Sequence, residues 1–343
     1  MFLLVYELHF YFLSPGFFFV VPLCSPFVDS PLRALLVSSE MHLPPVKLDH
    51  GYSPLTMSRG SVGSLVSQPS TDLTAMQKLV QRCLKSSRVG LHSIEEVSGR
   101  SHRIRLLVLS DGSRLALKLS PPPHRVVMRH ERNSLETEAI LSELLESDTK
   151  IRVPRIVRWD DRGRMLGTPF LLTTYVHGTS LRDLWPYMSQ AERDRTDLEL
   201  GKLLAAISQH ASSSFGTVAA VHSGKGSPSW RQAFRCLVEL SLRDAEDSLI
   251  ALPYTEIREQ VERFGPILDA VTEPRLVVFN GRDPANVLLD AQTRELVCLS
   301  DFSNAIWGDV LMSDSIADPT RAFLEGFGAC PERTGAARTR QLL

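Results

Sequence analysis

The chain of 343 residues passes from short strand-like hydrophobic runs to long helical ones, and this change limits the folds open to it. Between about residues 90 and 177, β-rich runs alternate with turn signals, and a helical pattern follows the third run. Beyond residue 177, apolar residues recur at helical spacing over long segments. A β-rich part followed by a helical part predicts an α+β protein with two lobes and a cleft between them.

The β-rich part predicts an antiparallel sheet of about five strands with one helix after the third strand. Asp111-Gly112 lies between two of the runs, and this dipeptide is a strong signal for a tight hairpin turn. Leucine and isoleucine at helical spacing predict a helix over 133–148. Two further strands are expected within 152–161 and 168–181.

Helical patterns lie on both sides of this sheet in the sequence. An amphipathic helix is expected to start at Thr71 or Asp72, with its apolar face formed by Leu73, Met76, Leu79, Val80 and Leu84. In the helical part, long helices are predicted at 191–211, 229–252 and 255–271. Two short strands, 275–280 and 295–301, are expected to flank a polar loop.

The first 70 residues differ in composition from the rest. Seven of the 15 Phe residues lie within residues 1–30, and residues 25–70 are rich in Ser and Pro without sustained periodicity. The apolar start lacks a basic region and is interrupted by Pro15 and Gly16, so a non-structural leader is favoured over a signal or membrane anchor. Membrane attachment through residues 1–30 stays open as the less favoured alternative.

Charge and cysteine content narrow the class of protein. The 38 basic and 39 acidic side chains give a formal net charge of −1, which argues against a nucleic acid as partner. The five cysteines are far apart and form no C-x-x-C pair, which argues against a disulfide framework and a cysteine zinc site. We therefore expect a reducing, cytoplasmic location.

Lys118 lies in the β-rich run that precedes three prolines, among apolar neighbours. A buried ammonium group is costly without an anionic partner, so Lys118 requires a carboxylate or a phosphate. The helical pattern that follows offers Glu136 and Glu138, and Glu138 leaves the leucine face free to pack. We expect Glu138 to pair with Lys118 and to hold it toward the phosphates of a nucleotide. Two independent, solvated charges are the alternative.

The turn before the second strand contains Ser98, Gly99 and Ser101. Small residues allow backbone N–H groups to approach a phosphate, so Ser101 is a candidate nucleotide contact. An ordinary hairpin turn explains the same residues.

Two oxygen-bearing side chains mark the ends of short strands in the helical part. Asn286 comes just before one strand and Asp301 just after the next. A hairpin between them brings the two side chains together, and Mg²⁺ bound to phosphates needs only one or two protein oxygen ligands. We therefore predict a Mg²⁺ site at Asn286 and Asp301, with local turn capping as the alternative.

From about residue 72 to its end, the chain resembles the aminoglycoside phosphotransferase family of kinase-like enzymes, and most closely its fungal branch. The resemblance is carried by LALKLSPPP, ETEAILSELL, VPRIV, GTPFLLTTYVHGTSL, NVLLD and DFSNAIWGD. It implies a bilobed protein-kinase-like fold. The N-terminal antiparallel β lobe is then expected over 72–174 and the mainly helical C-terminal lobe over 175–343, after a leader and disordered linker over 1–71.

The resemblance also implies ATP-dependent transfer of a phosphoryl group to a small molecule, with Mg²⁺. The nucleotide is expected between the lobes, with its adenine edge near Thr174, Tyr175 and Val176.

Carried over from the family, Lys118 contacts the α- and β-phosphates and Glu138 orients it. Asn286 and Asp301 bind Mg²⁺ in the same comparison. Asp309, in the WGD motif, has a structural role and braces the metal loop.

The catalytic loop departs from the family pattern. The family usually has H-G-D-x-x-x-x-N, with the aspartate five residues before the metal asparagine, and here that position is Gly281. Asp283, three residues before Asn286, is the nearby carboxylate that can accept a proton from a substrate hydroxyl, and it is our candidate catalytic residue. A turn at Asp283-Pro284 without a catalytic role explains it equally well.

The end of the chain also departs from the family. Val310 stands where proline is common, and the chain stops within the helical pattern GAARTRQLL. We therefore expect a C-terminal lobe that is shorter than in the relatives.

Two functions of different classes stay open. One is a kinase that phosphorylates a hydroxyl or amine of a small molecule, and the other is a catalytically silent kinase-like protein that binds a nucleotide or a partner. Protein-kinase activity is less favoured, because H-R-D and A-P-E motifs are absent from the sequence and DFS replaces D-F-G. The acceptor is expected to be selected within 180–273, where no residue type identifies it.

Overall fold

The computed structural model describes residues 70–97, 102–121, 125–148, 151–328 and 335–342. The leader and most of the linker expected over 1–71 therefore lie outside the described residues. The chain divides into two units, and the first, which includes Gln68–Leu343, contains all the described residues. Every described helix and strand belongs to the first unit. None of these helices is long and apolar enough to cross a membrane.

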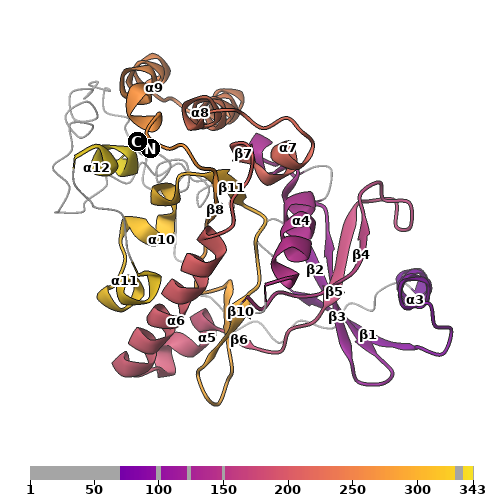
Figure 1. Ribbon diagram of the computed structural model, residues 1–343. Helices are drawn as coiled ribbons and strands as arrows, with labels where there is room; N and C mark the ends of the chain where they lie inside the picture. The colour runs from indigo at the N-terminus through magenta and orange to yellow at the C-terminus, as the bar shows by residue number, and fades with distance from the viewer. Residues whose placement is uncertain (1–69, 98–101, 122–124, 149–150, 329–334, 343) are drawn as a thin grey trace, which may run out of the picture. The chain divides into compact units, whose positions relative to one another are not determined.

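Five antiparallel strands form the main sheet, in the order β1-β2-β3-β5-β4 (Figure 1). Three of them come first along the chain and two follow a helix: β1 (Leu91–Val97), β2 (Arg103–Leu109), β3 (Arg114–Leu119), β4 (Ile156–Asp160) and β5 (Phe170–Thr174). The predicted sheet of five strands with a helix after the third is therefore confirmed.

The tight turn between β2 and β3 forms where the Asp-Gly signal predicted it. Gly112 has a φ of +83°, a conformation that glycine adopts without steric cost. The Asp111 carboxylate accepts a hydrogen bond from the Ser113 backbone N–H at 2.9 Å and so closes the turn. The hairpin then pairs Leu107 with Leu115 across the sheet.

Helix α3 (Ser70–Leu84) packs on the main sheet through a buried apolar cluster. Met76, Leu79 and Val80 are buried in it, as their spacing predicted. Leu73 differs from the expectation, because its side chain is 42% exposed, one turn before the buried stretch. The strand residues of the cluster alternate along their strands and so share one face of the sheet: Leu107, Leu109, Leu115, Leu117 and Leu119.

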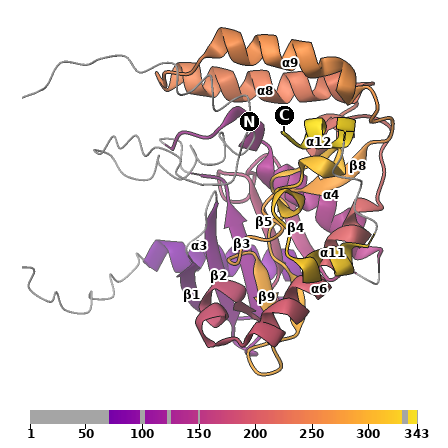
Figure 2. The same cartoon turned by 90° about the vertical axis from the view of Figure 1, so that its left-hand side faces the viewer.

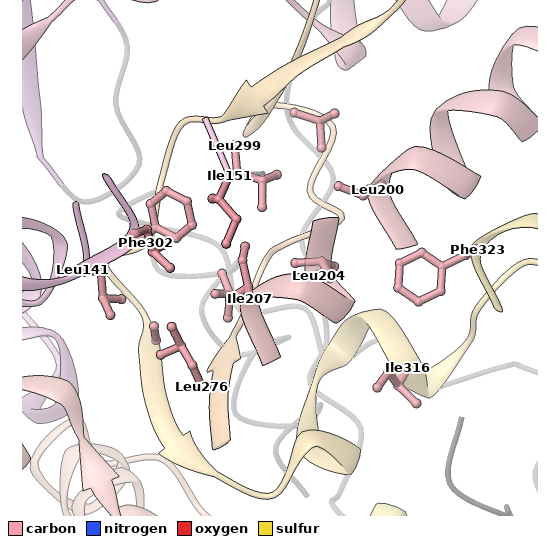
Figure 3. Close-up of a cluster of buried hydrophobic side chains, with 14 of the residues drawn as sticks. Leu141, Ile151, Leu200, Leu204, Ile207, Leu276, Leu299, Phe302, Ile316 and Phe323 are labelled. Carbon is pink, nitrogen blue, oxygen red and sulfur yellow. The ribbon is translucent and has the colours of Figure 1, made fainter. Parts of the chain in front are cut away.

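Helix α4 (Ser134–Glu146) packs in two directions. Leu135 and Ala139 form a small cluster with Leu171 of β5. The other apolar side of α4, with Leu141, belongs to the largest buried cluster of the described residues (Figure 3). That cluster also contains residues of the helical part, which include Leu200, Leu204, Leu276, Leu299 and Phe302.

The helical part contains three long helices and several short ones. The long helices are α6 (Gln190–Ser208), α8 (Trp230–Asp247) and α9 (Tyr254–Leu268), and they confirm the three predicted helices. Helices α8 and α9 lie side by side (Figure 2) and share an apolar cluster. The shorter elements are α5 (Leu181–Leu184), η2 (Trp185–Tyr187), α7 (Val218–His222), η3 (Val310–Met312), α10 (Asp314–Ala317), α11 (Arg321–Phe327) and α12 (Gly335–Leu342).

Two small sheets complete this part, in the orders β10-β9-β6 and β7-β11-β8. Their strands are β6 (Thr179–Ser180), β7 (Gly216–Thr217), β8 (Arg275–Val278), β9 (Val287–Leu289), β10 (Leu296–Leu299) and β11 (Ala305–Gly308). The two expected short strands are β8 and β10, and they belong to different sheets. No strand was predicted at β11, because all four of its residues are buried and the sequence there does not alternate.

The core assignment gives a stability prediction. Leu145 of α4 is fully buried in the largest cluster, so Leu145→Ala should lower the free energy of unfolding by about 2–5 kcal/mol through lost contacts and a residual cavity. The matched control is Leu249→Ala, at a side chain that is 92% exposed, and its change should stay within about 0.5 kcal/mol. Denaturant unfolding measures both, and equal losses would contradict the placement of Leu145 in the core.

Candidate nucleotide and metal site

Lys118 joins three parts of the molecule through one ammonium group. It lies in β3 opposite Ile104 of β2 and Leu171 of β5. Its Nζ donates hydrogen bonds to Oε1 of Glu138 in α4 and, at 3.0 Å, to the backbone carbonyl of Ser300, just after β10. The Lys118 and Glu138 side chains are 12% and 4% exposed. The predicted pairing of these two residues is therefore present.

The first turns of α4 place Glu138 beside Lys118. Ser134 and Glu138 are four residues apart and so lie on the same face of the helix. The Oγ of Ser134 is 2.8 Å from Nε2 of His102, which precedes β2, and both residues are buried. This buried link fixes the start of the helix against the main sheet.

His102 is a buried residue of this site that the sequence analysis did not identify. Burial, and then the nearby Lys118, lower its pKa to about 4, so the ring is neutral at neutral pH. In the sequence, the feature that could have identified His102 was its position next to the turn of small residues. Ser101, the candidate in that turn, lies outside the described residues, so its contact with a nucleotide stays a prediction.

The hairpin predicted between Asn286 and Asp301 is formed by β9 and β10. Val287 pairs with Leu299, and the Ser300 N–H donates to the Asn286 carbonyl at 2.9 Å. Asn286 therefore lies opposite Ser300, the residue before Asp301, so both candidate ligands are at the same end of the hairpin.

Negative charge is in excess around Lys118. Burial raises the pKa of Glu138 to about 7, Asp301 adds to this rise, and Lys118 opposes it. Burial acts in the same sense on Asp301, but Lys118 and hydrogen bonding from Ser303 outweigh it and hold the pKa of Asp301 below its usual value. Burial disfavours the charge of Lys118, but Glu138 and Asp301 together raise its pKa. Glu138 is thus the group of the three that titrates near neutral pH.

The available donor atoms fit a hard cation that also binds phosphates. Asn286 donates through Nδ2 to the Asn280 carbonyl at 3.4 Å, which leaves Oδ1 as its acceptor atom. The Oε2 atom of Glu138 is buried and has no hydrogen-bond partner among the described residues. Within that part of the chain, no group of three His, Cys, Asp or Glu residues could hold a metal by itself. Asn286 and Asp301 therefore fit Mg²⁺ that takes its other ligands from phosphate and water.

The three residues predicted at the adenine edge begin with Thr174, the last residue of β5, and continue into the segment after it. The Thr174 N–H donates to the Arg155 carbonyl at 2.9 Å, and the Tyr175 N–H donates to the Arg114 carbonyl at 3.2 Å. The Val176 N–H has no such bond to the described residues. Of the three, Val176 therefore has the backbone donor that is available to a nucleobase.

Asp283 is held by its own loop and by α5. Its Oδ1 accepts hydrogen bonds from the Ala285 N–H at 2.9 Å and from the Arg182 guanidinium at 3.2 Å. The backbone N–H of Arg182 donates in turn to the Pro284 carbonyl at 2.9 Å. These contacts define a capped turn and orient one carboxylate, so both roles considered for Asp283 remain compatible with the structure.

Gly281 stands at the family's aspartate position, and its surroundings are closely packed. A Cβ atom there would meet the two terminal methyl groups of Leu204 at 3.0 and 3.1 Å and Oγ of Ser315 at 3.4 Å. The neighbouring Asn280 has a φ of +60°, and its N–H donates to the Asp314 carboxylate at 3.0 Å. Asp314, which we did not predict, thus ties the loop to α10.

Asp309 has structural contacts. Its carboxylate accepts hydrogen bonds from the Leu311 N–H at 3.1 Å and from Nε of Arg340 in α12 at 2.8 Å. The motif therefore connects β11 to η3 and to the last described helix.

One curated protein matches part of the chain. It is the "Altered inheritance of mitochondria protein 9, mitochondrial" of Clavispora lusitaniae, which is 26% identical over 115 residues. The match covers 32% of this chain and 18% of that protein, so the chain spans less than a fifth of its length.

Several solved structures match the chain at low sequence identity. The gentamicin complex of APH(2")-IIa has a TM-score of 0.50 at 15% identity, over 81% of this chain and 85% of that chain. The streptomycin-ATP ternary complex of APH(2")-IIa gives 0.49 at 15% identity, over 81% and 86%. A putative fructosamine-3-kinase from Thermobifida fusca gives 0.44 at 18% identity, over 74% and 79%. The similarity to the gentamicin complex supports the bilobed kinase-like α+β fold.

The family model for the phosphotransferase enzyme family, APH, matches residues 93–312. This range covers more than half of the 343 residues and includes Lys118, Glu138, Asn286 and Asp301. The chain belongs to the phosphotransferase enzyme family.

Proposed function

We propose that the chain is a small-molecule kinase that transfers the γ-phosphoryl group of ATP, with Mg²⁺, to a hydroxyl or an amine. The observation that carries the proposal is the junction at Lys118. Its ammonium group contacts Glu138 and the Ser300 carbonyl, one residue before Asp301. A cation suited to phosphates and two candidate metal ligands thus belong to one connected group of residues. Membership of the phosphotransferase family supports the same class of reaction.

Each residue of the group has a distinct task in this proposal. Lys118 supplies positive charge to the α- and β-phosphates, and Glu138 keeps it oriented. Asn286 and Asp301 hold Mg²⁺, which when bound neutralises charge on the phosphates. Val176 offers its backbone N–H to the adenine edge. The protein needs little covalent chemistry of its own, because positioning and charge neutralisation accomplish most of phosphoryl transfer.

Asp283 is the proposed proton acceptor. The bond from the Ala285 N–H fixes the orientation of its carboxylate within the loop that leads to Asn286. A carboxylate held in this way can accept the proton of an incoming hydroxyl, provided that the acceptor reaches it within hydrogen-bond distance.

A catalytically silent nucleotide-binding protein is the second candidate, and Gly281 favours it. The position where the family has its aspartate is occupied by a glycine whose side-chain space is already filled by Leu204 and Ser315. In this alternative, the Lys118 junction binds a nucleotide and no phosphoryl group is transferred. The two candidates therefore differ only in the step after ATP binds.

The acceptor is proposed to be a small molecule rather than a nucleic acid, since the formal net charge of −1 provides no excess of positive charge. A cytoplasmic location is proposed, since the five cysteines are far apart in the sequence and suggest no disulfide framework.

Calorimetric titration with Mg-ATP tests the binding step. The wild-type chain should bind, and Asp301→Ala should weaken binding at least about tenfold, because a proposed ligand of the cation is lost. Asp161→Ala is the control, since Asp161 is an exposed carboxylate 3.6 Å from Arg162, and its affinity should equal that of the wild type. Absence of binding to the wild type would contradict both candidate functions.

Asp283→Asn tests the proton acceptor. The amide keeps an oxygen for the Ala285 N–H but cannot take up the proton, so turnover should fall about 10²–10⁴-fold with unchanged Mg-ATP affinity. ADP release with a panel of hydroxyl and amine acceptors measures this. Asp290→Asn is the matched control, because Asp290 accepts the Gln292 and Thr293 N–H groups at 2.8 Å in the next turn. Unchanged turnover in Asp283→Asn would make Asp283 a turn residue, and Mg-ATP binding without any turnover in the wild type would favour the silent protein.

Glu138 predicts a pH-dependent stability in metal-free protein. Its pKa is about 7 in the folded chain against 4.5 for an ordinary glutamate, so between these values the folded state binds more protons than the unfolded state. The stabilisation from this group is therefore complete below about pH 4.5 and is lost as the pH rises through about 7. The unfolding free energy of the wild type should therefore fall between about pH 5 and pH 8. In Glu138→Gln this fall should be smaller by on the order of 1–3 kcal/mol.

Denaturant titrations with a chelator present measure this difference. Glu136→Gln is the control, since Glu136 is on the same helix but only partly buried, and it should keep the wild-type pH dependence. An identical pH dependence in Glu138→Gln and the wild type would rule out a raised pKa at Glu138.

A further inference from the structure

A second set of charged residues joins η1 (Arg129–Glu131), which precedes α4, to helix α8. The Arg129 guanidinium contacts both Asp244 and Asp247 in the last turn of α8. The backbone N–H of Arg129 also donates to the second carboxylate oxygen of Asp244 at 2.8 Å. Asp244 is 8% exposed, whereas the Asp247 side chain is 65% exposed. Asp244 thus holds both the main chain and the side chain of Arg129.

The end of α8 requires a cation from another element. Its last turn contains Asp244, Glu246 and Asp247 and no basic residue. Carboxylates near the C-terminus of a helix are disfavoured by the helix dipole, and a cation there is stabilising. Glu246 pairs with Arg258 of α9 at 2.9 Å, and Arg129 pairs with Asp244 and Asp247. Without the guanidinium, Asp244 would be a buried carboxylate that lacks its cation, which is a costly state.

The segment held by α8 leads directly into the helix that positions Glu138. η1 ends at Glu131, and the Thr137 N–H already donates to the Asn133 carbonyl at 2.8 Å. Ser134 and Glu138 lie on one face of α4, in its first two turns, so a shift at η1 is expected to move both side chains. The position of η1 therefore sets how Glu138 approaches its lysine.

We propose that Arg129 is a positioning residue. Because its guanidinium pairs with Asp244 and Asp247, Arg129 fixes the start of α4 and thereby keeps Glu138 in contact with Lys118. Helix α8 belongs to the segment 180–273 that we expect to select the acceptor, so the contact joins that segment to the phosphate-binding lysine. The effect on ATP binding rests on the proposed function, whereas the effect on the Lys118–Glu138 pair does not.

The alternative is that the Arg129 contact only stabilises the fold. The other contacts that hold α4 make it possible to distinguish this role from a positioning role. Leu141 and Leu145 hold the middle of the helix in the largest buried cluster. Beyond its C-terminal end, Asp148 Oδ2 lies 3.6 Å from Nε2 of His210. Arg129 acts at the opposite end, on the turns that carry Glu138. Its loss should therefore loosen these turns while the rest of α4 stays packed.

The test treats the nucleotide-free protein with acetic anhydride and measures how fast the Lys118 amine is acylated. Mass spectrometry of the labelled peptide gives this rate. Asp244→Ala should raise this rate about tenfold relative to exposed Lys202, since a loosened Glu138 no longer protects the amine. Arg129→Ala should raise it less, because its backbone N–H still reaches Asp244. Asp247→Ala should change it less than about twofold, as expected for an exposed ion pair. This order follows from the contacts and not from overall stability.

Two control variants calibrate the measurement. Glu138→Ala sets the rate for an unpaired Lys118. Arg235→Ala removes an arginine of α8 itself, which pairs with Glu262 at 3.0 Å on the exposed side, and Lys118 in this variant should label at the wild-type rate. Arg129→Lys keeps the charge without the planar fork and should fall between the wild type and Arg129→Ala. If Asp244→Ala does not fold, the two Arg129 variants decide the question alone.

The results distinguish the proposal from its alternatives. A lower melting temperature with an unchanged Lys118 rate in the Arg129 variants would overturn it and leave a structural contact. If the wild type binds Mg-ATP, the dissociation constant of Arg129→Ala should rise by a factor similar to its labelling rate, and an unchanged constant would also overturn the proposal. If the wild type does not bind Mg-ATP, the proposed function fails, and the labelling rates still test the positioning of Glu138.

Discussion

The structure depends on the placement of one buried positive charge. Lys118 lies in the middle of the main sheet among apolar strand residues, where an ammonium group is costly without partners. Its partners are Glu138, 20 residues away in sequence, and the Ser300 carbonyl, 182 residues away. Solvation of this single group therefore requires helix α4 and the end of the β9–β10 hairpin to meet at the same strand. The remaining features of the site are arranged around this meeting point.

Helix α4 is the element shared between the main sheet and the helical part. Its apolar residues enter two clusters, one with Leu171 of β5 and one with residues of α6, β8 and β10. Its polar contacts follow the same division, since Ser134 contacts His102 before β2 while Arg129, just ahead of the helix, contacts α8. A helix fixed on both sides can hold the Glu138 carboxylate in one place beside Lys118, as the proposed orientation of this lysine requires.

Local signals predicted most of the fold, and long-range contacts account for what was missed. The Asp111-Gly112 turn, the five strands and the Lys118–Glu138 pair follow from periodicity and from the cost of a buried charge. The Arg129–Asp244 contact spans 115 residues, and nothing in either segment alone indicates it. Strand β11 was missed because a short, fully buried strand has no alternating pattern. Asp314 was missed because its partner is a backbone N–H group at Asn280.

The catalytic loop shows how packing limits the chemistry of the site. Asn280 has a left-handed conformation, and its N–H donates to Asp314. A Cβ atom at the next residue, Gly281, would lie within 3.4 Å of side-chain atoms of Leu204 and Ser315. A glycine fits there, whereas an aspartate would require these neighbours to move. Asp283 lies two residues further along the loop, where the Ala285 N–H fixes the orientation of its carboxylate, and this carboxylate is the group that we propose as the proton acceptor. Because Arg182 of α5 donates to the same carboxylate, the orientation of Asp283 also depends on the position of α5.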